Sequence, residues 1–312
     1  GILFARPLLS LMGTEDVVME QAVPYMRAYF CGMPGCFVYN YLAALLRSGG
    51  DTKRPLYFLL ASGVIKVVLS LLFVIVFKWG VAGVALSTAI GQAIAAAMVC
   101  LTLVKEKGPH HLDFKKLSID LPMAWDIIKI GVPAGIQGMV FALSNVVIQS
   151  SINSFGDVFM SGNTAAGSIE GFVYVTMNAF HQTALNFTGQ NMGAGQYKRV
   201  RRILEICLGC VAFAGIVVGG GVYLLRKPLL GIYIVESPDA LQAIAAGAER
   251  MLYVCIPYFI LGLMDVTTGV LRGLGSSFAP MIISVLGVCG FRIVWIYTVF
   301  ASQHTPGALF VS

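Results

Sequence analysis

Eight apolar segments limit what this 312-residue chain can fold into, because each is long enough to cross a lipid bilayer. They cover residues 24–46, 56–78, 81–104, 123–152, 163–188, 202–226, 247–271 and 280–301, and a shorter one ends near Leu9. About 20 residues of helix span a hydrocarbon layer of about 30 Å. Backbone groups in lipid must find partners within their own helix or in a closed barrel, whose strands have only about ten residues. The segments therefore predict an all-α integral membrane fold.

The composition is that of a protein whose solvent is lipid. Apolar residues make up 57% of the chain and charged residues 12%, and the mean hydropathy is +0.82, whereas soluble domains carry about 25% charged residues. The net charge of +6 comes without a long basic patch with interleaved aromatic residues, so we expect no nucleic-acid partner. All seven cysteines lie in apolar segments, and the pair Cys207 and Cys210 has no second pair nearby. Neither disulfides nor a metal site is predicted.

The longest polar connector covers residues 105–122 and divides the chain into two predicted lobes, residues 1–104 and 123–312. Lys and Arg concentrate in alternate connectors, and this linker carries Lys105, Lys107, Lys115 and Lys116. Short connectors rich in Lys and Arg stay on the cytoplasmic side of a membrane. We therefore expect a multi-pass protein of the cell inner (plasma) membrane with residues 105–122 in the cytoplasm.

Two patterns recur in the two lobes in the same order. Leu46, Arg47, Gly50 and Pro55 reappear with the same spacing as Leu271, Arg272, Gly275 and Pro280, and Leu3, Pro7, Leu8 and Leu9 reappear as Leu224, Pro228, Leu229 and Leu230. Such parallel repeats are common in transporters. From the repeat length we expect a complete protein of two pseudo-symmetric six-helix lobes, truncated here at both ends, with part of the third helix through the eleventh in this chain.

Several motifs at the ends of these segments resemble the bacterial type of the multidrug and toxic compound extrusion (MATE) transporters. The motifs are LRSGGDTKRP at 46–55, WGVAGVA at 79–85, GVP at 131–133, GQNMGAG at 189–195 and LRGLG at 271–275. The resemblance implies a V-shaped pair of lobes around a central cavity that opens to alternate sides. It also implies exchange of Na⁺ or H⁺ for organic, often cationic, amphipathic solutes, with no other cofactor, and we expect a monomer.

A polar ridge follows one face of the segment 163–188. Glu170 lies about seven residues into it, and Tyr174, Asn178, Gln182 and Asn186 follow at intervals of four. Residues four apart share a helix face, and amides facing lipid would lack partners. Hydrogen bonding between helices and a hydrated transport cavity both satisfy this ridge. In the segment 123–152 we expect Gln137, Asn145 and Gln149 to face it.

Glu170 and Asp265 are the predicted ion-coupling residues, because deep carboxylates in a membrane are functional candidates. Arg292 lies where it could reach Asp265, so a structural ion pair and a cation site are both open. In the repeat Asp265 corresponds to Asn40 and Arg292 lies near the counterpart of Lys66, which makes Asn40 a cavity candidate and Lys66 a charge partner. The segment 123–152 lacks the central acidic residue that one MATE subgroup has there. The coupling ion can therefore be either Na⁺ or H⁺.

Other functions fit the sequence less well. A flippase for lipid-linked oligosaccharides can share this architecture, but only Lys66 and Arg292 supply basic residues at core positions. The glycines at 189 and 193–195 are not followed by the Lys-Ser/Thr of a phosphate-binding loop, so no nucleotide partner is expected. No cluster of nucleophile, base and metal ligands indicates an enzyme. His181 fits a packing role better than a proton relay.

Overall fold

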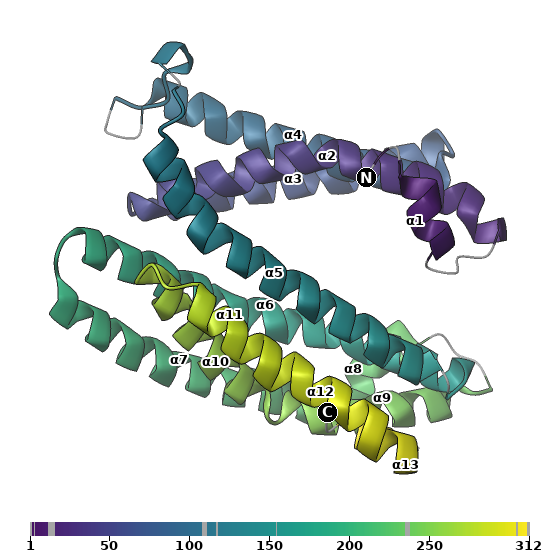
Figure 1. Cartoon of the computed structure of the whole chain (residues 1–312). Coiled ribbons are helices and arrows are strands. Elements are labelled where there is room, and N and C mark those ends of the chain that lie inside the picture. The colour runs from purple at the N-terminus through teal and green to yellow at the C-terminus, as the bar shows by residue number, and fades with distance from the viewer. Residues whose placement is uncertain are drawn as a thin grey trace. The chain divides into compact units, whose positions relative to one another are not determined.

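The computed structural model describes residues 2, 4–11, 16–107, 111–116, 118–153, 155–234, 238–303 and 305–310, and every regular element among them is helical. The chain divides into two compact units, Gly1–Ser118 and Ile119–Ser312 (Figure 1). This division lies within the predicted linker of residues 105–122. Residues 108–110 and 117 of that linker, and Leu3 of the predicted repeat, lie outside the described residues.

The first unit is built from three long helices. Its elements are α1 (Ala5–Leu11), α2 (Asp16–Ser48), α3 (Lys53–Leu71), which continues as the π-helix η1 (Leu72–Val76), α4 (Gly80–Lys105) and the short 3₁₀ helix η2 (Phe114–Lys116). Helix α4 packs against both α2 and α3. Its contact with α2 is close because Gly32 and Gly35 face Ala89 and Ala93 without side chains between them.

The second unit contains the remaining helices. They are α5 (Leu121–Asn153), α6 (Asp157–Gly193), α7 (Tyr197–Leu224), α8 (Arg226–Tyr233), α9 (Ala240–Cys255), α10 (Tyr258–Gly273), α11 (Phe278–Ser284), η3 (Val285–Gly290), α12 (Phe291–Trp295), η4 (Ile296–Phe300), α13 (Ala301–Gln303) and α14 (Pro306–Phe310). Elements α11 to α13 follow one another as one long helix with two π-helical stretches. Helices α9 and α10 meet at a 45° bend, next to Pro257, which has no N–H to continue the ladder.

All eight predicted segments are helical, which confirms the all-α membrane fold. By length and composition, six of the described helices can cross a membrane, and the bent pair α9–α10 makes a seventh. Helix α6 has 37 residues but is too polar to be among them. It begins at Asp157, earlier than the predicted segment, so Glu170 lies deeper in the helix than the sequence suggested.

The first of the two repeated patterns ends its helices α2 and α10 with the same backbone turn. At the end of α2 the N–H of Gly50 donates to Arg47 O (3.0 Å) and that of Asp51 to Leu46 O (3.0 Å); at the end of α10 Gly275 donates to Arg272 O (2.9 Å) and Ser276 to Leu271 O (3.0 Å). Both glycines have positive φ, +88° and +85°. This hydrogen-bond pattern is the Schellman motif, which favours glycine at its left-handed position.

Helix α6 is the centre of the second unit, since α7, α9 and α10 all pack against it. Val173, Met177 and Ala184 of α6 form a buried core with residues of α7 and α10, among them Val211 and Val266. The approach of α10 depends on Gly269, where an added Cβ would lie 2.7 Å from the backbone oxygen of His181. Close backbone contact of this kind is how small residues hold membrane helices together.

Replacing Gly269 with Ala is expected to lower the stability of the purified protein, because a Cβ there can only be accommodated if α10 moves away from α6. Forced overpacking costs about 1–3 kcal/mol. The matched control is Gly209→Ala in α7, where an added Cβ meets no atom within 4 Å. Thermal unfolding in detergent measures both, and equal melting temperatures for the two variants would contradict this packing.

Candidate functional site

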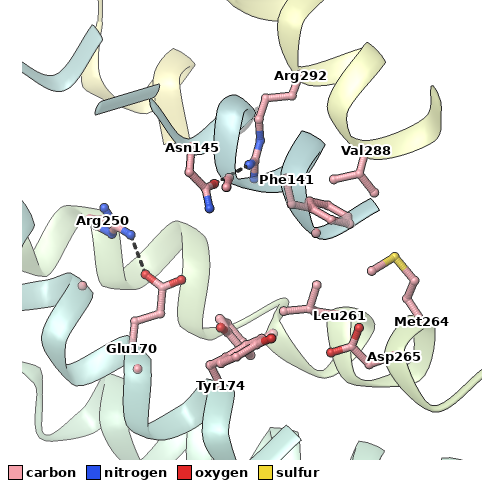
Figure 2. A pocket seen from close by; sticks show the side chains of 15 residues that line it. Phe141, Asn145, Glu170, Tyr174, Arg250, Leu261, Met264, Asp265, Val288 and Arg292 are labelled. Carbon is pink, nitrogen blue, oxygen red and sulfur yellow. Dashed lines mark hydrogen bonds and ion pairs between the residues drawn. The ribbon is translucent and has the colours of Figure 1, made fainter. Parts of the chain in front are cut away.

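The second unit contains an open cavity of about 610 Å³ between its helices (Figure 2). Polar walls come from α5, α6, α9, α10 and α12, and the rest of the lining is apolar or aromatic. The lining side chains that bear on the chemistry are Asn145, Glu170, Tyr174, Arg250, Asp265 and Arg292, with Phe141, Leu261, Met264 and Val288 between them. Cavities of this size and mixed lining suit organic ligands.

A second cavity of about 180 Å³ adjoins the first, and both share Gly138, Phe141, Tyr174 and Asp265 in their walls. Its own polar residues come from α5, α6 and α10: Gln137, Asn178, His181, Thr268 and Arg272. Asp265 therefore lies where the two cavities meet.

The predicted ridge of α6 contributes its first three members to these cavities. Glu170 lines the larger cavity, Tyr174 lines both, and Asn178 lines the smaller one. Gln182 and Asn186 are half-buried farther along α6 and belong to neither cavity. The predicted ridge thus follows the cavity walls over its first three members only.

Glu170 forms an ion pair that the sequence did not reveal. Its Oε2 accepts a hydrogen bond from Arg250 Nη2 of α9 at 2.5 Å, and Arg250 Nη1 donates to Asn163 Oδ1 at 2.6 Å. Asn163 is 3% exposed, and the side chains of Glu170 and Arg250 are 23% and 20% exposed. Arg250 thus holds α9 against two positions of α6 that lie two turns apart.

The three predicted amides of α5 take different partners. Gln137 accepts a hydrogen bond from Arg272 Nη2 (2.8 Å) and lines the smaller cavity together with Asn178. Asn145 lines the larger cavity with Glu170. Gln149 donates to Asn153 (3.0 Å) and lines a third cavity of about 340 Å³ near the start of α6.

Arg292, which the sequence placed within reach of Asp265, contacts Asn145 in the structure. Arg292 Nη1 donates to Asn145 Oδ1 of α5 at 3.1 Å. In Figure 2 Asp265 lies on the far side of the cavity, beside Leu261 and Met264. Arg292 extends from α12 towards α5, whereas Asp265 projects from α10, and the cavity separates the two side chains. This arrangement does not support an ion pair between Arg292 and Asp265.

His181 packs against α10, as the sequence favoured. Its Nδ1 lies 2.6 Å from the backbone oxygen of Asp265. Since a carbonyl oxygen only accepts hydrogen bonds, Nδ1 carries the proton. His181 is 8% exposed, yet it also lines the smaller cavity.

Arg272 belongs to the same wall of the smaller cavity. In the sequence it directly follows the predicted segment 247–271, and in the structure it is half-buried in the last turn of α10. The turn at Gly275 ends the helix directly after it and keeps its side chain beside Gln137.

The candidates of the first unit lie on exposed positions there. Asn40 donates to the backbone oxygen of Cys36 (2.9 Å), one turn earlier in α2, and Lys66 is an exposed residue of α3. Neither lines a described cavity.

The MatE family profile matches residues 1–72 and 133–298 of this chain. The chain belongs to the MatE family of transporters. Two relatives of this family come from Bacillus subtilis: the probable multidrug resistance protein YpnP is 30% identical over 92% of this chain, and the probable multidrug resistance protein YoeA is 25% identical over 94%. The chain spans 63% and 64% of their lengths.

A crystal structure of a mutant of the Vibrio cholerae MATE transporter VcmN has the same fold, with a TM-score of 0.87 at 19% identity. The superposition covers 99% of this chain and 69% of VcmN. The MATE fold thus extends over both units of this chain. Members of this family are transporters and not enzymes.

The Glu170–Arg250 pair predicts strong coupling between the two residues. Removing one charge leaves the other in a wall of low dielectric, so Glu170→Gln and Arg250→Gln should each destabilise the protein, and the double variant should lose less than the two single losses together. The expected coupling energy is about 0.5–3 kcal/mol. A double-mutant cycle from unfolding in detergent measures it, and additive effects would show that the pair contributes nothing.

Proposed function

We propose that this chain is part of a secondary antiporter that exports amphipathic organic solutes in exchange for Na⁺ or H⁺ by alternating access. The observation that carries the proposal is the cavity of about 610 Å³, which places two carboxylates, Glu170 and Asp265, among aromatic and aliphatic side chains. Deep carboxylates in membrane proteins mark ion and substrate pathways. The names of YpnP and YoeA, probable multidrug resistance proteins, agree with export.

Asp265 is the candidate for the coupling ion. Asp265 lines both cavities. An ion in the smaller cavity and a solute in the larger one can therefore compete for its carboxylate. A proton or Na⁺ bound there neutralises the charge, which weakens the binding of a positively charged solute and favours its release. Competition of this kind couples the two fluxes, because both ligands bias the same equilibrium.

Glu170 links the site to the helix arrangement. While Glu170 is ionised, Arg250 joins α9 to α6 through it. Neutralising Glu170 with a proton removes the charge attraction, and Arg250 then keeps its hydrogen bond to Asn163. The ion pair stabilises this arrangement of α6 and α9 only while Glu170 is ionised. Protonation of Glu170 therefore changes the free-energy difference between this conformation and another one.

The proposed setting follows from the charge pattern of the connectors. We place the protein in the plasma membrane as a monomer, with the linker of residues 105–122 in the cytoplasm. A small organic solute, the coupling ion and the bilayer are then its partners, and it uses no nucleic acid, nucleotide or other cofactor.

A lipid-linked oligosaccharide flippase is the second candidate. One observation favours it more than the sequence did: Arg250, Arg272 and Arg292 all line the two adjoining cavities, and a pyrophosphate headgroup requires such basic residues. Transport of a water-soluble dye by the purified protein would favour the exporter over this flippase.

In cells that make the intact protein, Asp265→Asn and Glu170→Gln should each reduce efflux of a cationic dye about 5- to 150-fold, since typical coupling energies are about 1–3 kcal/mol. The control Asp126→Asn removes a carboxylate that is 75% exposed and lines no described cavity. Efflux is compared at equal expression. Unchanged efflux in both cavity variants would exclude these residues from coupling.

A further inference from the structure

The charges around the two adjoining cavities are unequal. Among the described lining residues, three arginines face two carboxylates: Arg250, Arg272 and Arg292 against Glu170 and Asp265. With His181 counted as neutral, the net charge of the cavity walls is +1. Ion pairing among these residues does not change this sum. In a wall of low dielectric such an excess favours an anionic ligand.

Two of the arginines are held by contacts between helices. Arg250 donates to Glu170 and Asn163, and Arg272 donates to Gln137. The Nε atoms of both guanidinium groups are buried and make no hydrogen bond within the described residues. Because these two donors are closed off from solvent, a ligand in the cavities does not reach them.

Arg292 is the arginine whose place fits ligand recognition best. It extends into the larger cavity from α12 and donates to the neutral amide of Asn145 (Figure 2). A guanidinium matches carboxylates and phosphates with two parallel hydrogen bonds. Helix α12 lies between the π-helical stretches Val285–Gly290 and Ile296–Phe300, and π-helical turns are frequent at functional sites.

The rest of the cavity defines the body of the ligand. Phe141, Leu261, Met264 and Val288 lie between Arg292 and the carboxylate of Asp265. A ligand with its acidic group at Arg292 therefore places an apolar or aromatic body against these side chains. It also leaves Asp265, on the other side of the cavity, accessible to a coupling ion.

We propose that Arg292 and Asn145 form a subsite for the acidic group of an amphipathic solute, a carboxylate or a phosphate, in the cavity of the second unit. This inference rests on the proposed export function and identifies solutes that carry an anionic group as a preferred class of its substrates. Zwitterionic solutes can use the subsite with their positive end directed to Asp265. Purely cationic solutes depend on Asp265 and gain no affinity from the subsite.

The test measures binding of two matched probes, a coumarin-3-carboxylate dye and its methyl ester, to the intact protein in phosphatidylcholine nanodiscs. We expect the acid to bind about tenfold more tightly than the ester, because a charge-assisted hydrogen bond is lost in the ester. Arg292→Gln should abolish this preference, and Arg292→Lys, which keeps the charge but not the planar fork, should retain part of it. Equal affinities of the wild type for acid and ester would overturn the subsite.

Two further comparisons separate the possible outcomes. Arg201→Gln removes an exposed cation of α7, and a loss of acid preference in this control as well would overturn the assignment to Arg292. Displacement of the dye by added phosphatidylglycerol would support an anion subsite and assign it to a lipid headgroup. Export of a cationic dye by cells together with no acid preference would leave the proposed function standing and refute the subsite.

Discussion

A polar helix surrounded by hydrocarbon must turn its polar side chains towards other protein groups or towards water, and this requirement shapes the second unit. Helix α6 is more polar than an ordinary membrane-spanning helix. Its buried residues pack against α7, α9 and α10, and Glu170, Tyr174 and Asn178 line cavities. Side-chain amides that face lipid without a hydrogen-bond partner cost several kcal/mol each. The site is therefore a consequence of where α6 can place its polar face.

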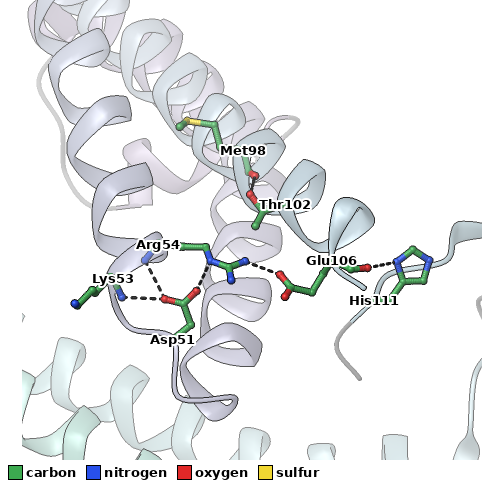
Figure 3. Close-up of polar contacts among 7 residues, drawn as sticks. All are labelled: Asp51, Lys53, Arg54, Met98, Thr102, Glu106 and His111. Atoms are coloured by element: carbon green, nitrogen blue, oxygen red, sulfur yellow. Dashed lines mark hydrogen bonds and ion pairs between the residues drawn. The ribbon is translucent and has the colours of Figure 1, made fainter. Parts of the chain in front are cut away.

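Close packing and charge then fix the neighbours of α6. Gly269 brings α10 against His181, and Arg250 ties α9 to Asn163 and Glu170. The first unit has its own ionic contacts near the α2–α3 turn, where Asp51 accepts from the N–H groups of Lys53 and Arg54 and the guanidinium of Arg54 bridges Asp51 and Glu106 (Figure 3). The matching turn at Gly275 is followed by Ser276 and carries no such acid. The repeat thus preserves the backbone turn while the charges around it differ.

Much of the fold could be predicted because its signals are local. Apolar length gave the helices, and the spacing around Gly50 and Gly275 gave the repeat. The polar ridge of α6 was visible because residues four apart share one face, but the sequence left open whether that face meets another helix or a cavity. The arginine partners escaped prediction for physical reasons. Arg250 lies near the start of the predicted segment 247–271 and Arg272 directly after its end. Their places in the cavity walls depend on how α9 and α10 pack against α6, which the sequence alone does not show. The order of the helices placed Arg292 within reach of Asp265. Helix order does not show how α12 is rotated about its axis, and this rotation decides which residue Arg292 contacts.

The central claim is that the polar face of α6 lies against water. Its most direct test is the reactivity of single cysteines with a small water-soluble methanethiosulfonate reagent, in the intact protein with its native cysteines replaced. Tyr174→Cys and Asn178→Cys should react readily, whereas Met177→Cys, at a position that is 0% exposed in the helix core, should not. Thiols at 174 and 178 as unreactive as the thiol at 177 would show a dry contact between helices and contradict the account.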